Sequence, residues 1–302
     1  MPISYDRVKN PELEMRRRID ALTAGTKPTK AMVQASIAPL IAKIDRTAKL
    51  RASTEAVADR NRSAVYNANR RTEKPSEREL DALNKYRQAA IATGQKLKVF
   101  SPTVQLGASQ IRSGSIWVAL STPYTDRWTV GDNAVANHLL GTWSTESVNT
   151  NQSLAGICTF FTPVPGRFNV RFAPFVSLSY SFYMNAFQLS FPPSPTVSRA
   201  SSSGFVGAYV TAWDGSQWVE MADARETLWD RRVSINDEVM DSYDSSQRGV
   251  QANFQTVGNP LTFALWAWGG VITSARDGTF GFGHSLARLE AAVPYVIIEQ
   301  MI

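Results

Sequence analysis

Residues 261–271 have the sequence LTFALWAWGGV, whose apolar side chains fit an extended strand. Successive side chains of a strand point to opposite faces. One face of this segment carries three large apolar side chains: Leu261, Phe263 and Leu265. The other face carries Thr262, Ala264 and Trp266. Such alternation is typical of one layer in a two-layer β structure, in which each strand keeps one face toward the core.

Further strand-like segments recur on both sides of this one. Turn signals separate them, including Pro163, the PPSP run at 192–195 and Asp214-Gly215, which is a strong hairpin signal. The clearest segments are SIWVAL (115–120), RFNVRF (167–172), FVSLSYSFYM (175–184), AFQLSF (186–191), GFVGAYVTAW (204–213), QWVEM (217–221) and VPYVIIEQM (293–301).

Helical patterns do not alternate with these segments, which indicates an antiparallel β-sandwich of jelly-roll-like type. One stretch differs from the rest. Residues 223–247, DARETLWDRRVSINDEVMDSYDSSQ, are polar and do not alternate. They predict a long excursion with a short helix.

The chain changes character at Lys98, its last lysine. Residues 1–98 hold 21 Lys and Arg against 11 Asp and Glu, whereas residues 99–302 hold 11 Arg against 15 Asp and Glu. All eight Trp lie in the second part. The sequence therefore predicts an α+β protein in two parts: a helical, coiled-coil-like assembly segment over 1–98 and a β-sandwich head domain over 99–302.

Two helices are expected before residue 70. The first begins at Asn10, an N-cap residue followed by proline, and ends near Gly25. The second covers about 29–69. Pro39 lies inside it, so we expect a kink or a break near Ala38.

A third helix has the clearest start signal in the chain. Ser76 follows Pro75, and Glu79 three residues later completes a capping box. Gly94 is expected to end this helix.

The second helix carries an apolar seam. Its first part recurs at spacings of four, three and four: Val33, Ile37, Leu40 and Ile44. At heptad spacing the seam continues with smaller and more polar residues: Leu50, Thr54, Val57, Asn61, Ala64 and Ala68. Two interpretations fit equally well. The helices pack against one another or the β part, or copies of the chain form a parallel, trimeric stalk whose oligomer interface contains the first four residues.

Bulk features limit the classes of protein. The sequence has no run of about 18 apolar residues, and its beginning lacks the apolar core of a secretory signal. Cys158, the single cysteine, is expected to pack as a small buried hydrophobe. Lys and Arg near the N-terminus are interleaved with acids, as in ERELDALNKYR, which does not favour nucleic-acid binding.

The sequence contains no recognisable catalytic, metal-binding or cofactor motif. His138 and His284 lack metal-ligand spacing and are expected to be structural. Four acids lack the spacing of a calcium loop and are expected to lie in a solvated loop: Asp237, Glu238, Asp241 and Asp244. We therefore expect no catalytic residues, no bound metal and no cofactor.

One candidate ligand site is a turn flanked by tryptophans. Trp213, Asp214 and Trp218 surround the expected hairpin. An aromatic face stacks on the apolar face of a sugar ring, although tryptophans more often serve as core or subunit contacts. The sequence offers these residues as a possible carbohydrate platform.

Three features together resemble virion proteins of tailed bacteriophages, particularly minor tail or fibre proteins. They are the capped helix PELEMRRRIDAL, the heptad-bearing segment, and a Trp- and Gly-rich β module ending LWAWGGV…DGTFGFGHSLARLEAAVPYVII. The resemblance implies a non-enzymatic virion component, a homotrimer that contacts other virion proteins and binds a host surface or carbohydrate. An interrupted seam or a folded-back third helix would favour a compact decoration or connector role over a long fibre.

Two other classes remain open. One is an icosahedral coat protein with a basic internal segment and a jelly-roll shell domain. The other is a polysaccharide-degrading enzyme on a β scaffold, for which a carboxylate pair such as Glu146 and Asp132 would be the candidate.

Overall fold

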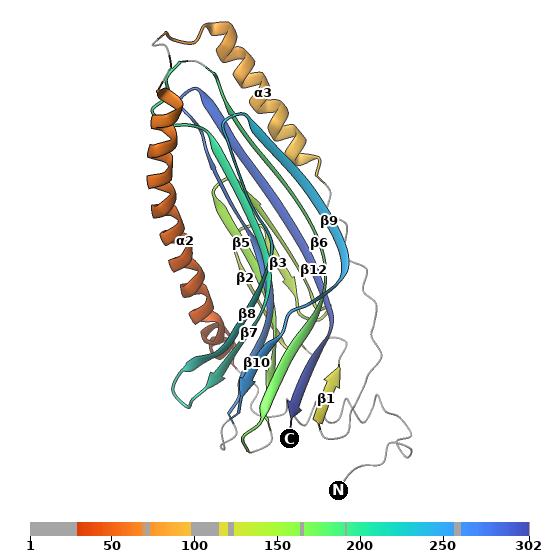
Figure 1. Ribbon diagram of the computed structural model, residues 1–302. Helices are drawn as coiled ribbons and strands as arrows, with labels where there is room; N and C mark the ends of the chain where they lie inside the picture. Colours follow the sequence, from red (N-terminus) through yellow and green to blue (C-terminus); the bar gives the residue numbers. More distant parts are fainter. Residues whose placement is uncertain are drawn as a thin grey trace.

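The computed structural model describes residues 29–68, 70, 73–97, 115–119, 124–163, 166–190, 192–256 and 261–301. Within these ranges, two helices precede a large antiparallel β-sandwich (Figure 1). The predicted order of helices followed by a two-sheet sandwich is thereby confirmed. The predicted helix from Asn10 to Gly25 lies outside the described residues.

One layer is a five-stranded sheet with the strand order β2-β5-β11-β7-β8. Its central strand β11 pairs antiparallel with β5 on one side and β7 on the other. The strands are β2 (Asp126–Val130), β5 (Asn151–Phe161), β7 (Arg199–Trp213), β8 (Trp218–Ser234) and β11 (Phe263–Arg276).

The second layer is a seven-stranded sheet with the order β10-β6-β12-β4-β3; β9 also pairs with β6, and β1 with β12. Its two long strands, β6 and β12, pair along most of their length. The strands are β1 (Ser115–Ala119), β3 (Ala134–Asn137), β4 (Thr142–Val148), β6 (Asn169–Gln188), β9 (Asp237–Gly249), β10 (Ala252–Gln255) and β12 (Gly281–Met301).

The alternation in β11 divides its side chains between two cores. Phe263 and Leu265 lie in the core between the sheets. Ala264 and Trp266 lie in a second core on the outer face of the five-stranded sheet. Both faces of β11 are therefore buried, which explains why both are apolar.

Helix α2 (Lys30–Asn67) covers that outer face. Thr29 caps its N-terminus by accepting a hydrogen bond from the Met32 amide. The helix is continuous through Pro39, so the break considered near Ala38 does not occur. Packing against the sheet on both sides of Pro39 offsets the missing backbone hydrogen bond, which costs about 3 kcal/mol in an unsupported helix.

Helix α3 (Glu77–Gln95) lies on the outer side of the seven-stranded sheet, opposite α2 (Figure 1). The capping box of Ser76 and Glu79 is present as predicted. Only Ala90 and Gly94 of this helix are buried, against Tyr183 and neighbouring side chains. The helix is thus held through its C-terminal half.

The prediction for residues 223–247 is wrong. This stretch forms most of β8 and β9, joined by a tight turn in which Ile235 and Asn236 have φ of 50° and 61°. β8 is the edge of one sheet and β9 lies at the edge of the other. Edge strands are partly open to water, so most side chains here are polar and the apolar alternation expected of an inner strand is weak. Within the described residues, no helix is long and apolar enough to cross a membrane.

Candidate functional site

The four residues predicted to form an oligomer interface lie inside their own chain. Val33, Ile37, Leu40 and Ile44 are 2%, 1%, 0% and 3% exposed. They pack on the outer face of the five-stranded sheet, against side chains that include Phe160 and Trp266. This corrects the intersubunit assignment, because these side chains have no surface left for a partner. The alternative of intramolecular packing against the β part describes the structure.

The predicted continuation of the seam is also corrected. Leu50, Val57 and Ala64 face solvent. The buried face of α2 continues instead through Glu55, Asp59, Ser63 and Tyr66. A straight helix repeats every 3.6 residues and drifts away from a strict seven-residue repeat.

Two buried hydrogen bonds to Ser36, which we call the Ser36 pin, fix α2 at one position on the sheet. The indole Nε1 of Trp266 donates to Ser36 Oγ at 2.9 Å, and Thr211 Oγ1 donates to the Ser36 carbonyl at 3.1 Å. Ser36 and both partners are buried. Sliding α2 by one turn would leave the donors of Trp266 and Thr211 unpaired. Because an unpaired buried donor costs free energy, the shifted arrangement would be less stable.

Further along α2, two acidic side chains enter a cluster of arginines. Glu55 pairs with three guanidinium groups: those of Arg51, Arg199 and Arg232, at 3.4, 3.0 and 3.7 Å. Asp59 pairs with those of Arg62, Arg199 and Arg276, at 3.1, 3.3 and 2.9 Å. We call these seven residues the arginine cluster.

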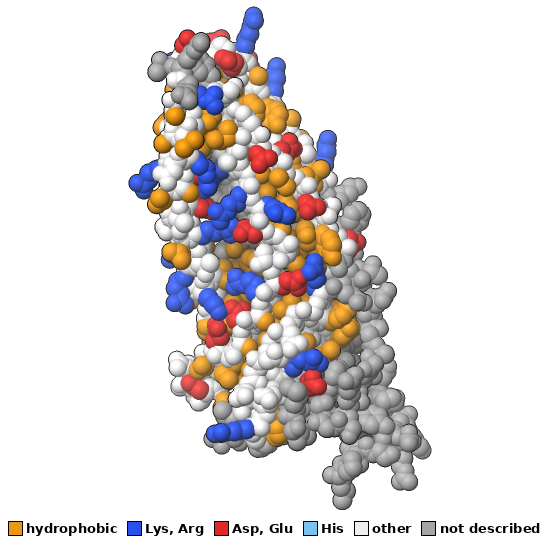
Figure 2. All heavy atoms as spheres, in the orientation of Figure 1, with side chains coloured by type: hydrophobic (Ala, Val, Ile, Leu, Met, Phe, Trp, Pro, Cys, Tyr) orange, Lys and Arg blue, Asp and Glu red, His pale blue; other side chains and the backbone are white. Residues whose placement is uncertain are grey.

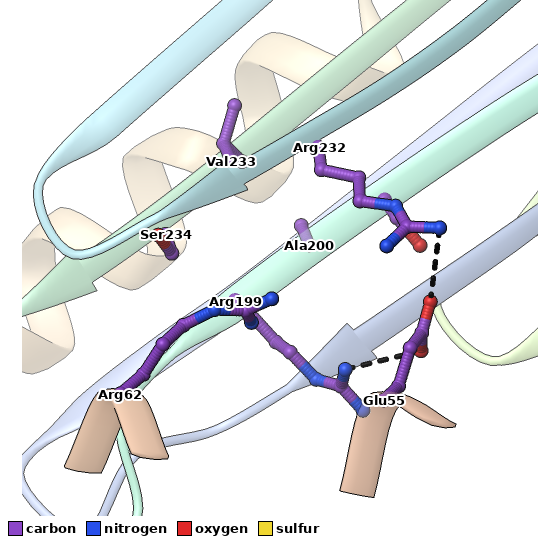
Figure 3. Close-up of a pocket in the computed structure, with 8 residues that line it drawn as sticks. Glu55, Arg62, Arg199, Ala200, Arg232, Val233 and Ser234 are labelled. Atoms are coloured by element: carbon purple, nitrogen blue, oxygen red, sulfur yellow. Dashed lines mark hydrogen bonds and ion pairs between the residues drawn. The ribbon is translucent and has the colours of Figure 1, made fainter. Parts of the chain in front are cut away.

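A small hollow opens within the arginine cluster, between α2, β7 and β8 (Figure 3). Its volume is about 100 Å³. Its lining residues are Glu55, Arg62, Arg199, Ala200, Ser201, Arg232, Val233 and Ser234. Lys and Arg side chains also gather on this side of the molecule in the space-filling view (Figure 2).

The arginine cluster could not be predicted from sequence spacing, because its members come from α2, β7, β8 and β11. One local signal was available. Glu55 and Asp59 are four residues apart on the same face as the apolar seam, in phase with a 3.6-residue repeat. Acids on the buried face of a helix require basic partners from the surface that the helix covers.

The structure brings Trp213, Asp214 and Trp218 together in the β7–β8 hairpin. Asp214 Oδ1 accepts hydrogen bonds from the amides of Ser216 and Gln217, both at 2.8 Å, and these bonds lower the pKa of Asp214. The Trp213 and Trp218 rings are 5.5 Å apart. Trp218 is only 7% exposed and belongs to the core beneath α2. Carbohydrate stacking at this hairpin stays a prediction, and Trp213 is the ring still partly open to solvent.

A different surface is apolar and open. Val135, Leu139 and Leu140 are 63%, 71% and 64% exposed, on β3 and the turn that follows it. β3 ends the path of the seven-stranded sheet, and β2 ends the five-stranded sheet. Arg127 of β2 donates to the carbonyl of Ala136 in β3 at 2.9 Å. Among the strands that the structure describes, neither edge has a further partner, and the two edges lie side by side. We call the three apolar residues with these edges the β2–β3 edge patch.

Of the two carboxylates considered for enzyme chemistry, Glu146 has a structural partner. Arg288 Nε donates to Glu146 at 2.5 Å, while Asp132 lies in the β2–β3 turn. Burial lowers the pKa of His284, and the positive charge of Arg87 lowers it further. Cys158 is fully buried, as expected, and burial raises the pKa of its thiol.

The acids Asp237, Glu238, Asp241 and Asp244 are not in a loop but on β9, where successive side chains point to opposite sides. Across the described part of the chain, no group of three or more His, Cys, Asp or Glu side chains could hold a metal ion.

No known protein family matches the chain, and no curated protein matches it either. Among solved structures, a CBM4 structure is 13% identical, covering 53% of this chain and 94% of that one, with a TM-score of 0.16. A structure of carbohydrate-binding modules from the β-sandwich superfamily is 12% identical over 50% and 54%, with a TM-score of 0.14. Infectious bursal disease virus strain Gx gives 10% identity over 66% and 42%, with a TM-score of 0.15. Likenesses this weak carry no functional argument, so function is argued below from the chain itself.

Proposed function

We propose that the protein is a structural subunit of a virus particle that assembles with copies of itself. The β2–β3 edge patch carries this proposal. Edge strands present unpaired backbone groups, and proteins usually protect them with charges or coverage. Here three large apolar side chains lie beside two edges that pair with no further strand in the described residues, although β2 also carries the charged Arg127. Exposed apolar patches of this kind are typical of protein–protein contacts.

A second copy of this chain is the proposed occupant. An edge strand can pair with the same strand of another copy, because a two-fold axis makes the two surfaces self-complementary. Repeated copies are also what a particle requires. The resemblance of the sequence to tailed-bacteriophage virion proteins supports self-association but favours a trimer, in which the patch meets a different surface of the next copy rather than the same strand.

The folded-back helices support a compact decoration or connector role rather than a fibre. α2 and α3 cover the two outer sides of the sandwich (Figure 1). The seam that would have extended a stalk is buried in the same chain. Any binding of a host-surface glycan would then occur on the assembled particle.

Light scattering coupled to size exclusion tests this proposal on the full chain at micromolar concentration. The expected mass is a multiple of the 33.3 kDa subunit. Replacing Leu139→Ser together with Leu140→Ser should shift the protein to the monomer mass, because the apolar contact is lost. A monomeric parent protein would contradict the proposal.

The matched control is Val57→Ser together with Val65→Ser. These two apolar side chains are exposed on α2, away from the β2–β3 edge patch. The control should keep the parent mass. If it dissociates while the edge variant does not, the contact lies on α2 and the edge assignment fails. Negative-stain images of the assembled protein would separate a compact ring from an elongated fibre.

A further inference from the structure

We propose that the hollow in the arginine cluster binds a tetrahedral oxyanion, a phosphate or sulfate group, through Arg62, Arg199 and Arg232. Three of the four charged side chains that line it are arginines, and the fourth is Glu55. Figure 3 shows Arg62 reaching in from α2, while Arg199 and Arg232 come from neighbouring strands. The proposal concerns a ligand site and is independent of the self-assembly proposed above.

The charge of the arginine cluster is unbalanced. Within it, five guanidinium groups share two carboxylates, those of Glu55 and Asp59. Asp230 adds a third carboxylate, but it faces Arg51 at the rim. Positive charges held close together in a partly desolvated place repel one another, and a bound anion relieves that repulsion.

The guanidinium group of Arg232 makes the longest ion pair in the arginine cluster. In the described structure, its ion pair with Glu55 spans 3.7 Å, which is longer than a hydrogen bond. Its side chain is 50% exposed. A guanidinium group offers five donors in a planar fork that suits phosphate and sulfate oxygens. Arg232 is therefore free to turn toward an anion while Arg51 and Arg199 continue to neutralise Glu55.

The size of the hollow selects a small group. About 100 Å³ accommodates a single oxyanion but not a sugar ring or a nucleobase together with it. Ser201 and Ser234 line the same hollow and can supply hydroxyl donors. Because the hollow is open to solvent, the oxyanion can be a free ion or the end of a larger molecule.

Calorimetric titration of the full chain tests the site with four probes: inorganic phosphate, inorganic sulfate, glycerol phosphate and, as a planar monovalent control, acetate. Titrations are made at constant ionic strength set with chloride. We expect saturable binding of phosphate and sulfate and little or none of acetate. Binding of glycerol phosphate as tight as that of phosphate identifies an ester as the acceptable source, whereas its failure restricts the site to the free ion.

Arg232→Gln should weaken phosphate binding about tenfold or more, since it removes a charged donor pair. Its half-exposed side chain predicts that the variant folds, which circular dichroism checks. Arg231→Gln is the matched control, with the same charge change one residue away on the opposite face of β8. It should bind as the parent does.

Two results would overturn the proposal. One is the absence of saturable binding of phosphate and sulfate by the parent protein. The other is an equal loss in Arg231→Gln and Arg232→Gln, which would show general charge attraction rather than a site. Subunit mass, measured in parallel, reports separately on self-assembly.

Discussion

Trp229 shows how closely single residues are fitted inside the sandwich. Its ring stacks against both Tyr180 and Phe182, with centroids at 4.5 and 5.2 Å, and its Nε1 donates to Ser202 Oγ at 2.8 Å. The ring lies directly over Gly204, where any β-carbon would clash with it. A glycine at 204 is therefore required by the close approach of an aromatic ring.

Gly204→Ala is expected to lower the free energy of unfolding by about 1–3 kcal/mol, the usual cost of overpacking a core. Urea denaturation followed by tryptophan fluorescence measures the change. Gly249→Ala is the control, since no atom lies near an added β-carbon there, and it should cost nothing. Equal stability of the two variants would mean that Trp229 moves freely.

His284 gives the fold a sensitivity to acid. It is buried beneath α3, and its Nε2 would lie 3.0 Å from a β-carbon added at Gly94. The pKa of His284 is lowered by burial and by Arg87, so the unfolded chain binds the proton more readily than the folded one. The stability from neutral His284 is complete above about pH 6.5, the ordinary histidine pKa, and is lost as the pH falls below it.

The test compares urea midpoints at about pH 7.5 and about pH 5.5. His284→Gln should show a smaller drop between these values than the parent, because the group that gains the proton is absent. A drop of unchanged size in His284→Gln would assign the acid sensitivity to carboxylates.

At the scale of elements, α2 is docked by two different kinds of force. Its first half, residues 33–44, is held mainly by apolar burial and the Ser36 pin, although Lys43 also pairs with Glu220 and Asp223. Its second half, residues 51–63, is held mainly by the arginine cluster. Apolar burial does not weaken with added salt, whereas partly exposed ion pairs are screened.

Hydrogen exchange should separate the two halves. In about 0.5 M NaCl the screening length falls to roughly 4 Å. Amides of residues 51–63 should then exchange faster, while those of residues 33–44 keep their protection. Equal protection at low and high salt would show that packing, not charge, holds the second half.

The two helices show which features could be predicted from the sequence and which could not. The four-three-four spacing of Val33, Ile37, Leu40 and Ile44 predicted an apolar face correctly. Spacing alone could not identify the surface that buries this face, because a neighbouring chain and a sheet of the same chain require the same stripe. The capping box at Ser76 was predictable because all its atoms lie within four residues.

The whole molecule has two contrasting sides, which sequence patterns could not separate. At the β8–β9 side, charged residues face one another, with Arg248 donating to Glu226. At the β2–β3 side, three large apolar side chains, Val135, Leu139 and Leu140, are exposed beside the charged Arg127 and Asp132. Charges protect a sheet edge from association and exposed apolar side chains favour it, so the molecule is expected to associate through the β2–β3 side.

Strand β9 and most of β8 were missed because few of their side chains enter a core. The arginine cluster was missed because Arg199, Arg232 and Arg276 meet α2 only after the sheet has formed. Local patterns therefore predicted the layers and the helix starts, while the candidate site depends on contacts between distant segments.

The position of Cys158 allows chemical labelling of its thiol to report on the undocking of α2. The thiol lies in the core beneath α2 together with Leu40. A disulfide reagent that releases a coloured product can therefore react with it only after the helix has moved away from the sheet. The labelling rate should therefore time that lifting without any engineered dye. Leu40→Ala should accelerate it, and rapid labelling of the parent would mean that the helix spends much of its time detached.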